Sequence, residues 1–137
     1  MKIKIVNKSD LNQAQLDYIN ERITDRSHEN DTGPRKFWNI YTKGLYAAID
    51  CENHKIVGLI EASGPKDAVN PGWWIDSKHR NKGYGKAIVI ELAKVLKNLG
   101  YDGVADICIQ TYKNEYDQAS KKLKEIFIHE FKNEKLK

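Results

Sequence analysis

At 137 residues, the chain is long enough for one domain, over residues 1–137, with a single hydrophobic core, and too short for two. Apolar residues make up 40% of it and charged residues 31%, and no apolar run is long enough to span a membrane, so we expect no membrane partner. The net charge of +4 is too small to predict nucleic-acid binding, although it is compatible with a local site for a phosphorylated ligand.

The first third of the chain predicts a strand, a helix and a short helical segment. Lys2–Asn7 alternates apolar with polar residues, as strands do. A helix follows, capped by Ser9 or Asp10, and its apolar residues keep helical spacing to about Thr24. The polar stretch after it predicts a loop, and Lys36–Thr42 indicates one or two further helical turns.

The middle of the chain predicts three strands and a long helix. Leu45–Cys51 and Lys55–Ala62 flank a short polar turn, so we expect a hairpin. Ser63–Gly72 contains two glycines and two prolines, which predicts a loop before the strand Trp73–Asp76. Gly83–Leu99 has its polar residues on one stripe, as in a helix that is buried on most sides.

The rest of the chain completes a mixed α/β pattern. Gly100 is the expected C-terminal cap of the long helix, and Val104–Tyr112 is the expected next strand. Asn114 then caps a last helix, for which apolar spacing favours one continuous element over Glu115–Lys132. The alternative is a helix that ends near Lys124, followed by a strand over 125–131.

Cysteine and histidine form no metal-binding pattern. Cys51 and Cys108 lie in apolar runs without the spacing of metal ligands, and the four histidines are scattered. We therefore expect two buried thiols and no metal. The N-terminal segment lacks the apolar core of a secretory signal, so we expect a cytoplasmic protein.

Two glycines one residue apart, Gly83 and Gly85, stand where the tryptophan-rich strand leads into the buried helix. The free backbone N–H groups of a helix N-terminus, together with the helix dipole, make a site for an anion, most often phosphate. Glycines let the phosphate approach the backbone, and Arg80, Lys82 and Lys86 add positive charge. The alternative is a glycine-tolerant loop with a solvated basic patch. The P-loop and dinucleotide motifs do not fit, because the residues after Lys86 are alanine and isoleucine.

The stretch instead resembles the central motif of the Gcn5-related N-acetyltransferase (GNAT) superfamily. In that motif, a strand ending in an aliphatic residue leads into Arg/Gln-x-x-Gly-x-Gly/Ala and a helix. The corresponding residues here are Ile75, Arg80, Gly83 and Gly85. Ser77 stands where proline is usual, and Asn81 replaces a common glycine, which it can do because asparagine also enters left-handed conformations. The order of elements matches the family to about Leu123.

The resemblance implies an α/β fold with a mixed, mostly antiparallel, splayed sheet flanked by helices. It also implies acetyl-coenzyme A as donor and a primary amine as acceptor, whose site the first helix and residues 25–42 would line. The pyrophosphate would be held by the backbone amides of Asn81, Lys82, Gly83, Tyr84, Gly85 and Lys86. The pantetheine arm would pair with the backbone of Trp73, Trp74 and Ile75 and would contact Asn114. At least one of the two tryptophans is expected to be a core residue.

Acetyl transfer to an amine needs a base for the amine and a proton donor for the leaving thiolate. Glu61, on the strand next to the motif strand, is the candidate base, with Asp76 as the alternative. The family often has a tyrosine acid in its last helix, but Lys124 occupies that position here. Tyr116 is the nearby candidate acid, and Tyr112 lies close in sequence.

The chain departs from the family pattern at its end, since the family normally adds two strands after the last helix. Without them, the acceptor side would be open, or a sheet edge would be left at which a second copy could pair as a homodimer. The missing acid and strands also support an alternative function, a non-catalytic, regulatory acyl-coenzyme A-binding module. A nucleic-acid partner is not expected, because aromatic and basic residues do not interleave.

Overall fold

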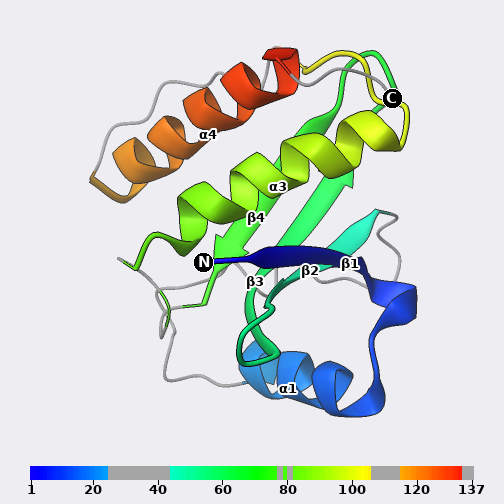
Figure 1. Cartoon of the computed structure of the whole chain (residues 1–137), viewed down its shortest axis with the longest axis vertical. Coiled ribbons are helices and arrows are strands. Elements are labelled where there is room, and N and C mark those ends of the chain that lie inside the picture. Colours follow the sequence, from blue (N-terminus) through cyan, green and yellow to red (C-terminus); the bar gives the residue numbers. More distant parts are fainter. Residues whose placement is uncertain (25–43, 77–78, 80–81, 106–114, 134–137) are drawn as a thin grey trace.

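The computed structural model describes residues 1–24, 44–76, 79, 82–105 and 115–133. Within them, four strands form one antiparallel sheet in chain order (Figure 1). These strands are β1 (Ile3–Asn7), β2 (Leu45–Asp50), β3 (Lys55–Ser63) and β4 (Asn70–Ile75). The predicted hairpin is therefore confirmed, and the sheet is antiparallel as the family resemblance implied.

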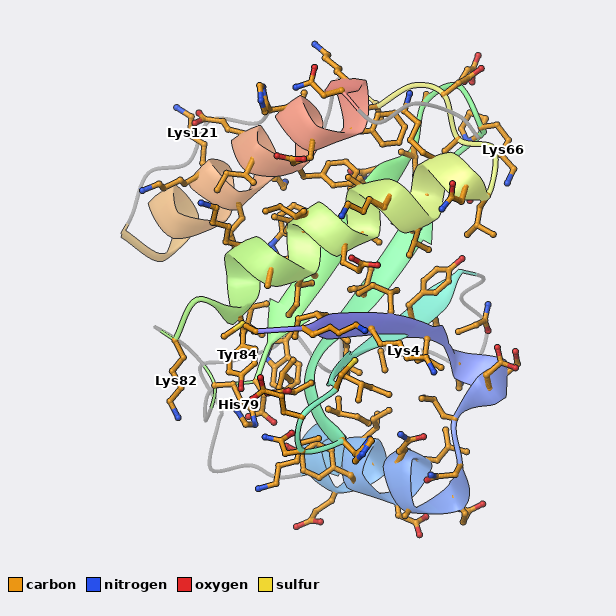
Figure 2. All side chains as sticks on the ribbon, viewed as in Figure 1. Lys4, Lys66, His79, Lys82, Tyr84 and Lys121 are labelled. Carbon is orange, nitrogen blue, oxygen red and sulfur yellow. The ribbon has the colours of Figure 1, made fainter. Side chains whose placement is uncertain are left out.

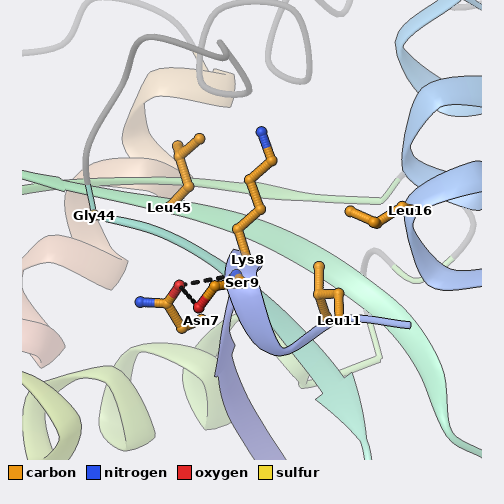
Figure 3. Close-up of a pocket in the computed structure, with 7 residues that line it drawn as sticks. All are labelled: Asn7, Lys8, Ser9, Leu11, Leu16, Gly44 and Leu45. Carbon is orange, nitrogen blue, oxygen red and sulfur yellow. Dashed lines mark hydrogen bonds between the residues drawn. The ribbon is translucent and has the colours of Figure 1, made fainter. Parts of the chain in front are cut away.

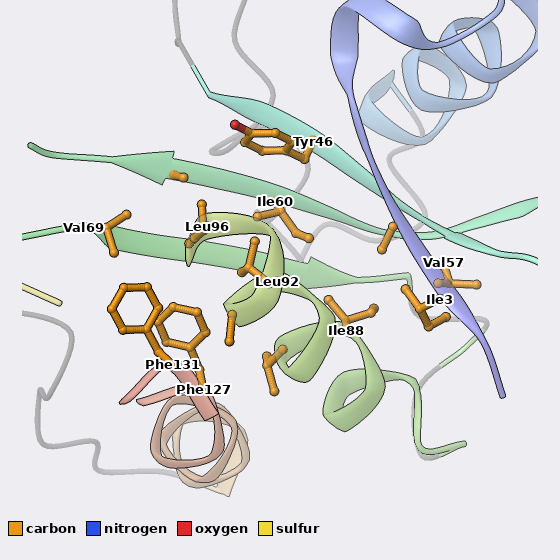
Figure 4. Close-up of a cluster of buried hydrophobic side chains, with 14 residues drawn as sticks. Ile3, Tyr46, Val57, Ile60, Val69, Ile88, Leu92, Leu96, Phe127 and Phe131 are labelled. Carbon is orange, nitrogen blue, oxygen red and sulfur yellow. The ribbon is translucent and has the colours of Figure 1, made fainter. Parts of the chain in front are cut away.

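One face of the sheet is covered by α3 (Tyr84–Asn98) and α4 (Glu115–Asn133), which lie side by side (Figures 1 and 4). From α3, the side chains that are fully buried against the sheet are Ile88, Val89, Leu92, Ala93 and Leu96. From α4, Phe127 and Phe131 enter the same cluster with their ring centroids 5.6 Å apart. A fully buried side chain of this size stabilises the fold by ~1.5–3 kcal/mol, so this cluster holds both helices on the sheet.

The opposite face is covered by α1 (Gln13–Thr24), from which Ile19 packs into a second cluster. Leu59 from β3 and Trp74 from β4 meet it there, and Trp74 is 3% exposed. Trp73 points to the α3–α4 face instead, with its ring centroid 6.1 Å from that of Phe127. Both tryptophans therefore pack against hydrophobic clusters, which agrees with the expectation of a core role.

The N-terminal cap of α1 differs from the prediction. Lys8–Asp10 forms a short 3-10 helix, η1, so Ser9 and Asp10 precede the helix and do not cap it. Asn12 is the cap, because its side chain accepts the N–H of Gln15 at 2.8 Å. The Gln15 side chain in turn accepts the N–H of Asn12 at 2.9 Å, which completes a reciprocal capping box.

The loop predicted over 63–72 is too long, since β4 begins at Asn70 and pairs with Ser63. Pro71 is compatible with a strand here. Asp76 donates its N–H to the carbonyl of Val57 in β3, so alternation turns the nitrogen of Pro71 away from β3 and no ladder bond is lost. Just before β4, Val69 forms a parallel bridge with Val104, so the segment after α3 starts beside β4.

The two helices after β4 agree well with the sequence. Gly100 has φ 95°, and the N–H groups of Gly100 and Tyr101 bond the carbonyls of Lys97 and Leu96, which is the predicted glycine cap. The continuous helix α4 confirms the long-helix interpretation and excludes a strand over 125–131. Lys36–Thr42 and most of the strand predicted over 104–112, with Cys108, lie outside the described residues. Cys51 is a free thiol that is half-buried, not fully buried as expected.

Candidate functional site

The N-terminal end of α3 has the open backbone that the sequence predicted for an anion site. Gly83 is the cap residue, with φ 83° and ψ 1°, a left-handed conformation that strongly favours glycine. Among the described residues, a Cβ atom built there would meet no atom nearer than the Cε of Met1, at 4.0 Å. The first N–H groups of α3 have no acceptor within the helix, so they can be offered to an anion that approaches at Gly83.

Gly85 has a different surrounding. A Cβ atom on it would lie 3.0 Å from the Cδ1 and 3.3 Å from the Cδ2 of Leu123 in α4. The second glycine of the motif therefore lets α3 and α4 approach closely, a packing role that the sequence reasoning did not foresee. A bulky substitution at Gly85 would disturb this helix contact as well as any ligand.

The cations of the predicted loop are only partly within the described residues. Lys82 and Lys86 are exposed at the start of α3, and Lys82 lies close to His79 and Tyr84 in the side-chain view (Figure 2). Arg80 and Asn81 lie outside the described residues, as does Asn114. Positive charge thus stands next to the open backbone at Gly83.

An acidic residue that sequence reasoning missed lies beneath this turn. Asp50, at the end of β2, is only 4% exposed, and its carboxylate accepts the hydroxyl of Tyr84 at 2.6 Å and the N–H of Glu52 at 2.9 Å. The hydrogen bond from Tyr84 is the main reason that the pKa of Asp50 is lowered, and the same bond raises the pKa of Tyr84. The available signal was an aspartate that ends an otherwise apolar strand.

His79 packs against the ring of Tyr84. The two rings meet edge to face, with centroids 5.5 Å apart and an interplanar angle of 81°. The His79 N–H donates to the carbonyl of Asp76 at 2.8 Å, which ties the turn to the end of β4. Burial lowers the pKa of the imidazole, although the nearby carboxylate of Asp76 acts in the opposite direction.

Asp76, the alternative base, is fully buried. Its carboxylate accepts the hydroxyl of Tyr18 from α1, and its backbone N–H bonds the carbonyl of Val57. This enclosure gives the carboxylate a structural partner on the α1 face of the sheet.

Glu61 lies in β3 directly opposite Gly72 of β4, so the predicted neighbouring strand is confirmed. Its other cross-strand partner is Leu45, whose side chain belongs to the cluster under α1. Directly opposed residues share a face of the sheet, so Glu61 points to the α1 side, where it is half-buried. A half-buried carboxylate can contact both solvent and a bound ligand.

The backbone of β4 is oriented as a pantetheine-binding edge requires. Since Asp76 donates to β3, alternation along the strand directs the peptide groups of Trp73 and Ile75 toward the opposite edge. β4 is the last strand of the sheet within the described part of the chain.

Of the two tyrosines considered as acid, Tyr116 belongs to α4, and Tyr112 lies outside the described residues. Tyr116 lies in the first turn of α4. Leu123 contacts Gly85, and Lys124 is the next residue of the helix. Lys124 is half-buried at the position where the family often has tyrosine.

A cavity of about 400 Å³ opens at the other end of the sheet (Figure 3). It is lined by Asn7, Lys8, Ser9, Leu11, Leu16, Gly44 and Leu45. The Asn7 side chain accepts both the N–H and the hydroxyl of Ser9, at 3.0 Å and 2.9 Å, which fixes one polar wall. Leu45 is the cross-strand partner of Glu61, so cavity and carboxylate are neighbours on the same side of the sheet.

Comparison with known protein families matches the chain to the model of the Acetyltransferase (GNAT) family over residues 12–119. The match includes α1, strands β2 to β4 and α3. No curated protein and no solved structure matches the chain. Among the described residues, no cluster of histidine, cysteine, aspartate and glutamate is arranged to hold a metal ion, and no helix is long and apolar enough to cross a membrane.

Proposed function

The chain belongs to the GNAT acetyltransferase family, and we propose that it transfers an acetyl group from acetyl-coenzyme A to the primary amine of an acceptor. The observation that carries this proposal is the left-handed Gly83 at the start of α3, where no atom of the described residues lies closer than 4.0 Å to the place of a Cβ atom. A backbone without a side chain, at the positive end of a helix, suits a pyrophosphate.

The residues present fit acetyl-coenzyme A as co-substrate. The amides from Asn81 to Lys86 would hold the pyrophosphate, and the exposed Lys82 and Lys86 would add charge. The outward edge of β4 at Trp73 would pair with the pantetheine arm. When bound, the co-substrate supplies a thioester whose carbonyl carbon is open to attack by an amine.

Glu61 is the proposed base. An alkyl amine has a pKa near 10.4 and arrives protonated at neutral pH, so it must lose a proton before attack. Glu61 faces the side of the sheet that carries the cavity beside Leu45, which makes this side the proposed entry for the acceptor. The lining of the cavity combines leucine side chains with amide, hydroxyl and ammonium groups, as expected for an acceptor with an aliphatic body.

The proton donor for the leaving thiolate would come from α4. Tyr116 is the proposed acid, and Lys124, next to the Leu123 contact, is another ionisable residue of the same helix. If neither acts, the chain would be the non-catalytic acyl-coenzyme A-binding module.

Gly83→Ala tests the co-substrate site, and Gly100→Ala is its matched control. Both glycines have positive φ, 83° and 95°, and they flank the same helix, so alanine costs a similar ~1–2 kcal/mol of backbone strain at either end. We expect calorimetry to give at least tenfold weaker acetyl-coenzyme A binding in Gly83→Ala and unchanged binding in Gly100→Ala. Equal affinities in the two folded variants would contradict the site.

Catalysis is tested with the unmodified chain. Release of coenzyme A thiol in the presence of polyamines, aminoglycosides or lysine peptides would establish turnover and the class of acceptor. Tight acetyl-coenzyme A binding without turnover across that panel would favour the binding module instead.

A further inference from the structure

The hydrogen bond between Asp50 and Tyr84 joins the end of β2 to the first residue of α3, 34 positions along the chain. From this contact we infer that Asp50 and Tyr84 form a brace that fixes the turn at Gly83, and that Asp50 is a positioning residue for acetyl-coenzyme A. This inference rests on the proposed function. It adds that the end of β2 supports the proposed phosphate-binding turn.

The turn needs a support because its own residues provide little. Glycine is the residue with the greatest backbone freedom, so a Gly-Tyr-Gly segment costs more entropy to order than other sequences. Gly83 is the cap residue of α3 and has no side chain with which to cap it. Tyr84 carries the one side chain of this segment. Its hydroxyl bonds Asp50, its ring meets that of His79, and it packs against the edge of the cluster under α3 and α4.

Asp50 is a firm anchor for this purpose. It ends a strand that pairs on both sides, with β1 through Ile3 and with β3 through Lys55. Its carboxylate is buried and is also held by the N–H of Glu52 in the hairpin turn. Because two neighbouring strands fix the end of β2, the hydrogen bond to Asp50 holds the Tyr84 side chain in one place. The backbone amides on either side of Tyr84 are thereby restrained too.

The negative charge of Asp50 is an apparent disadvantage beside an anion site, since like charges repel. A carboxylate, however, makes a charge-assisted hydrogen bond that is about twice as strong as a neutral one. The hydrogen bond between Asp50 and Tyr84 therefore favours phosphate binding, whereas the negative charge of Asp50 opposes it. Substitutions of Asp50 can separate the two effects. Asparagine keeps an oxygen for the Glu52 N–H and an amide group for the Tyr84 hydroxyl but removes the charge, whereas alanine removes the contact.

The experiment compares Tyr84→Phe, Asp50→Ala, their double variant and Asp50→Asn, with Tyr101→Phe as control beyond the other end of α3. Calorimetry with acetyl-coenzyme A should show Tyr84→Phe and Asp50→Ala each weakened about tenfold, equivalent to ~1.4 kcal/mol. The double variant should be no weaker than the worse single variant, since both remove one contact. Asp50→Asn should bind within about threefold of the unmodified chain, and Tyr101→Phe should bind equally well.

Amide hydrogen exchange on the ligand-free protein separates this inference from the proposed function. Tyr84→Phe should speed exchange of the amides from Tyr84 to Ala87 at least fivefold and leave those near Asn98 unchanged, whichever ligand the protein binds. Unchanged exchange at the start of α3, or additive losses of affinity in the double variant, would overturn the brace. Faster exchange in a protein whose unmodified form does not bind acetyl-coenzyme A would keep the brace and reject the proposed function.

Discussion

At the scale of single residues, three carboxylates on the sheet have different surroundings and so different tasks. Asp50 is buried and bonded to Tyr84, and Asp76 is buried and bonded to Tyr18. Glu61 alone among the three is half-buried, on the side of the cavity. Proton transfer needs a group that can reach a ligand, so of the three carboxylates we propose Glu61 as the base.

Glu61→Gln should therefore lower turnover about 100-fold or more near neutral pH, the low end of what a positioned base contributes. The affinity for acetyl-coenzyme A should stay the same, because the carboxylate is proposed to act on the acceptor. The deficit should narrow as pH rises, since more of the amine then arrives deprotonated. Steady-state rates against pH measure this, with Glu52→Gln in the exposed hairpin turn as control, and equal rates in Glu61→Gln and the unmodified chain would exclude the role.

Asp50 predicts a dependence of stability on pH. Its pKa is lowered in the folded protein, chiefly by the hydrogen bond from Tyr84, so its contribution to stability is present above the unfolded pKa of ~3.9. That contribution is lost as pH falls through the folded value. Urea unfolding should show that Asp50→Asn is less stable than the unmodified chain at pH 7 and that the difference shrinks below about pH 4. A difference that is constant with pH would show that the charge of Asp50 is not involved.

At the scale of elements, the contact between α3 and α4 depends on a glycine. A Cβ atom at Gly85 would lie 3.0 Å from the Cδ1 of Leu123, so the Leu123 side chain would have to shift for α3 to stay this close to α4. This contact places α4, with Tyr116 and Lys124, in a fixed relation to the proposed phosphate-binding turn.

Gly85→Val should therefore destabilise the protein by ~1–3 kcal/mol, the usual cost of overpacking, although valine is a better helix former than glycine. Leu123→Ala in the same chain should recover part of the loss, because it removes the atoms that valine meets. Thermal unfolding of the single and double variants tests this. Stability losses that simply add would mean that residue 85 does not press on Leu123.

At the scale of the whole molecule, the sheet separates two hydrophobic clusters with different tasks. The cluster with α3 and α4 contains Phe127, Leu92 and Ile60 and holds the helix whose N-terminus faces the proposed co-substrate. The cluster with α1 contains Ile19 and Trp74 and supports the side with Glu61 and the cavity. Trp73 and Trp74 are adjacent residues of β4. Trp73 packs against the cluster with α3 and α4, and Trp74 belongs to the cluster with α1, so one strand contacts both clusters.

The sequence by itself determined the features that depend on neighbouring residues. The hairpin, the buried helix α3, its cap at Gly100 and the continuous α4 were all predicted, because periodicity and glycine caps act within a few positions. The family motif around Gly83 is local too, and it led to the family. Local signals gave a wrong prediction where several capping residues stand close together. Ser9 and Asp10 were predicted to cap α1, but Asn12 caps it.

Only the tertiary structure decided which distant residues meet. Tyr18 and Asp76 are 58 positions apart and Asp50 and Tyr84 are 34 apart, and no pattern in the sequence pairs them. The role of Gly85 depended on Leu123, which belongs to another helix. Such contacts follow from how the sheet and helices pack. The hydrophobic effect that drives packing depends on the apolar area buried, so a sequence pattern that predicts burial does not say which distant residue will be the partner. For that reason the hydrogen bond between Asp50 and Tyr84, at the proposed phosphate-binding turn, became visible only in the folded molecule.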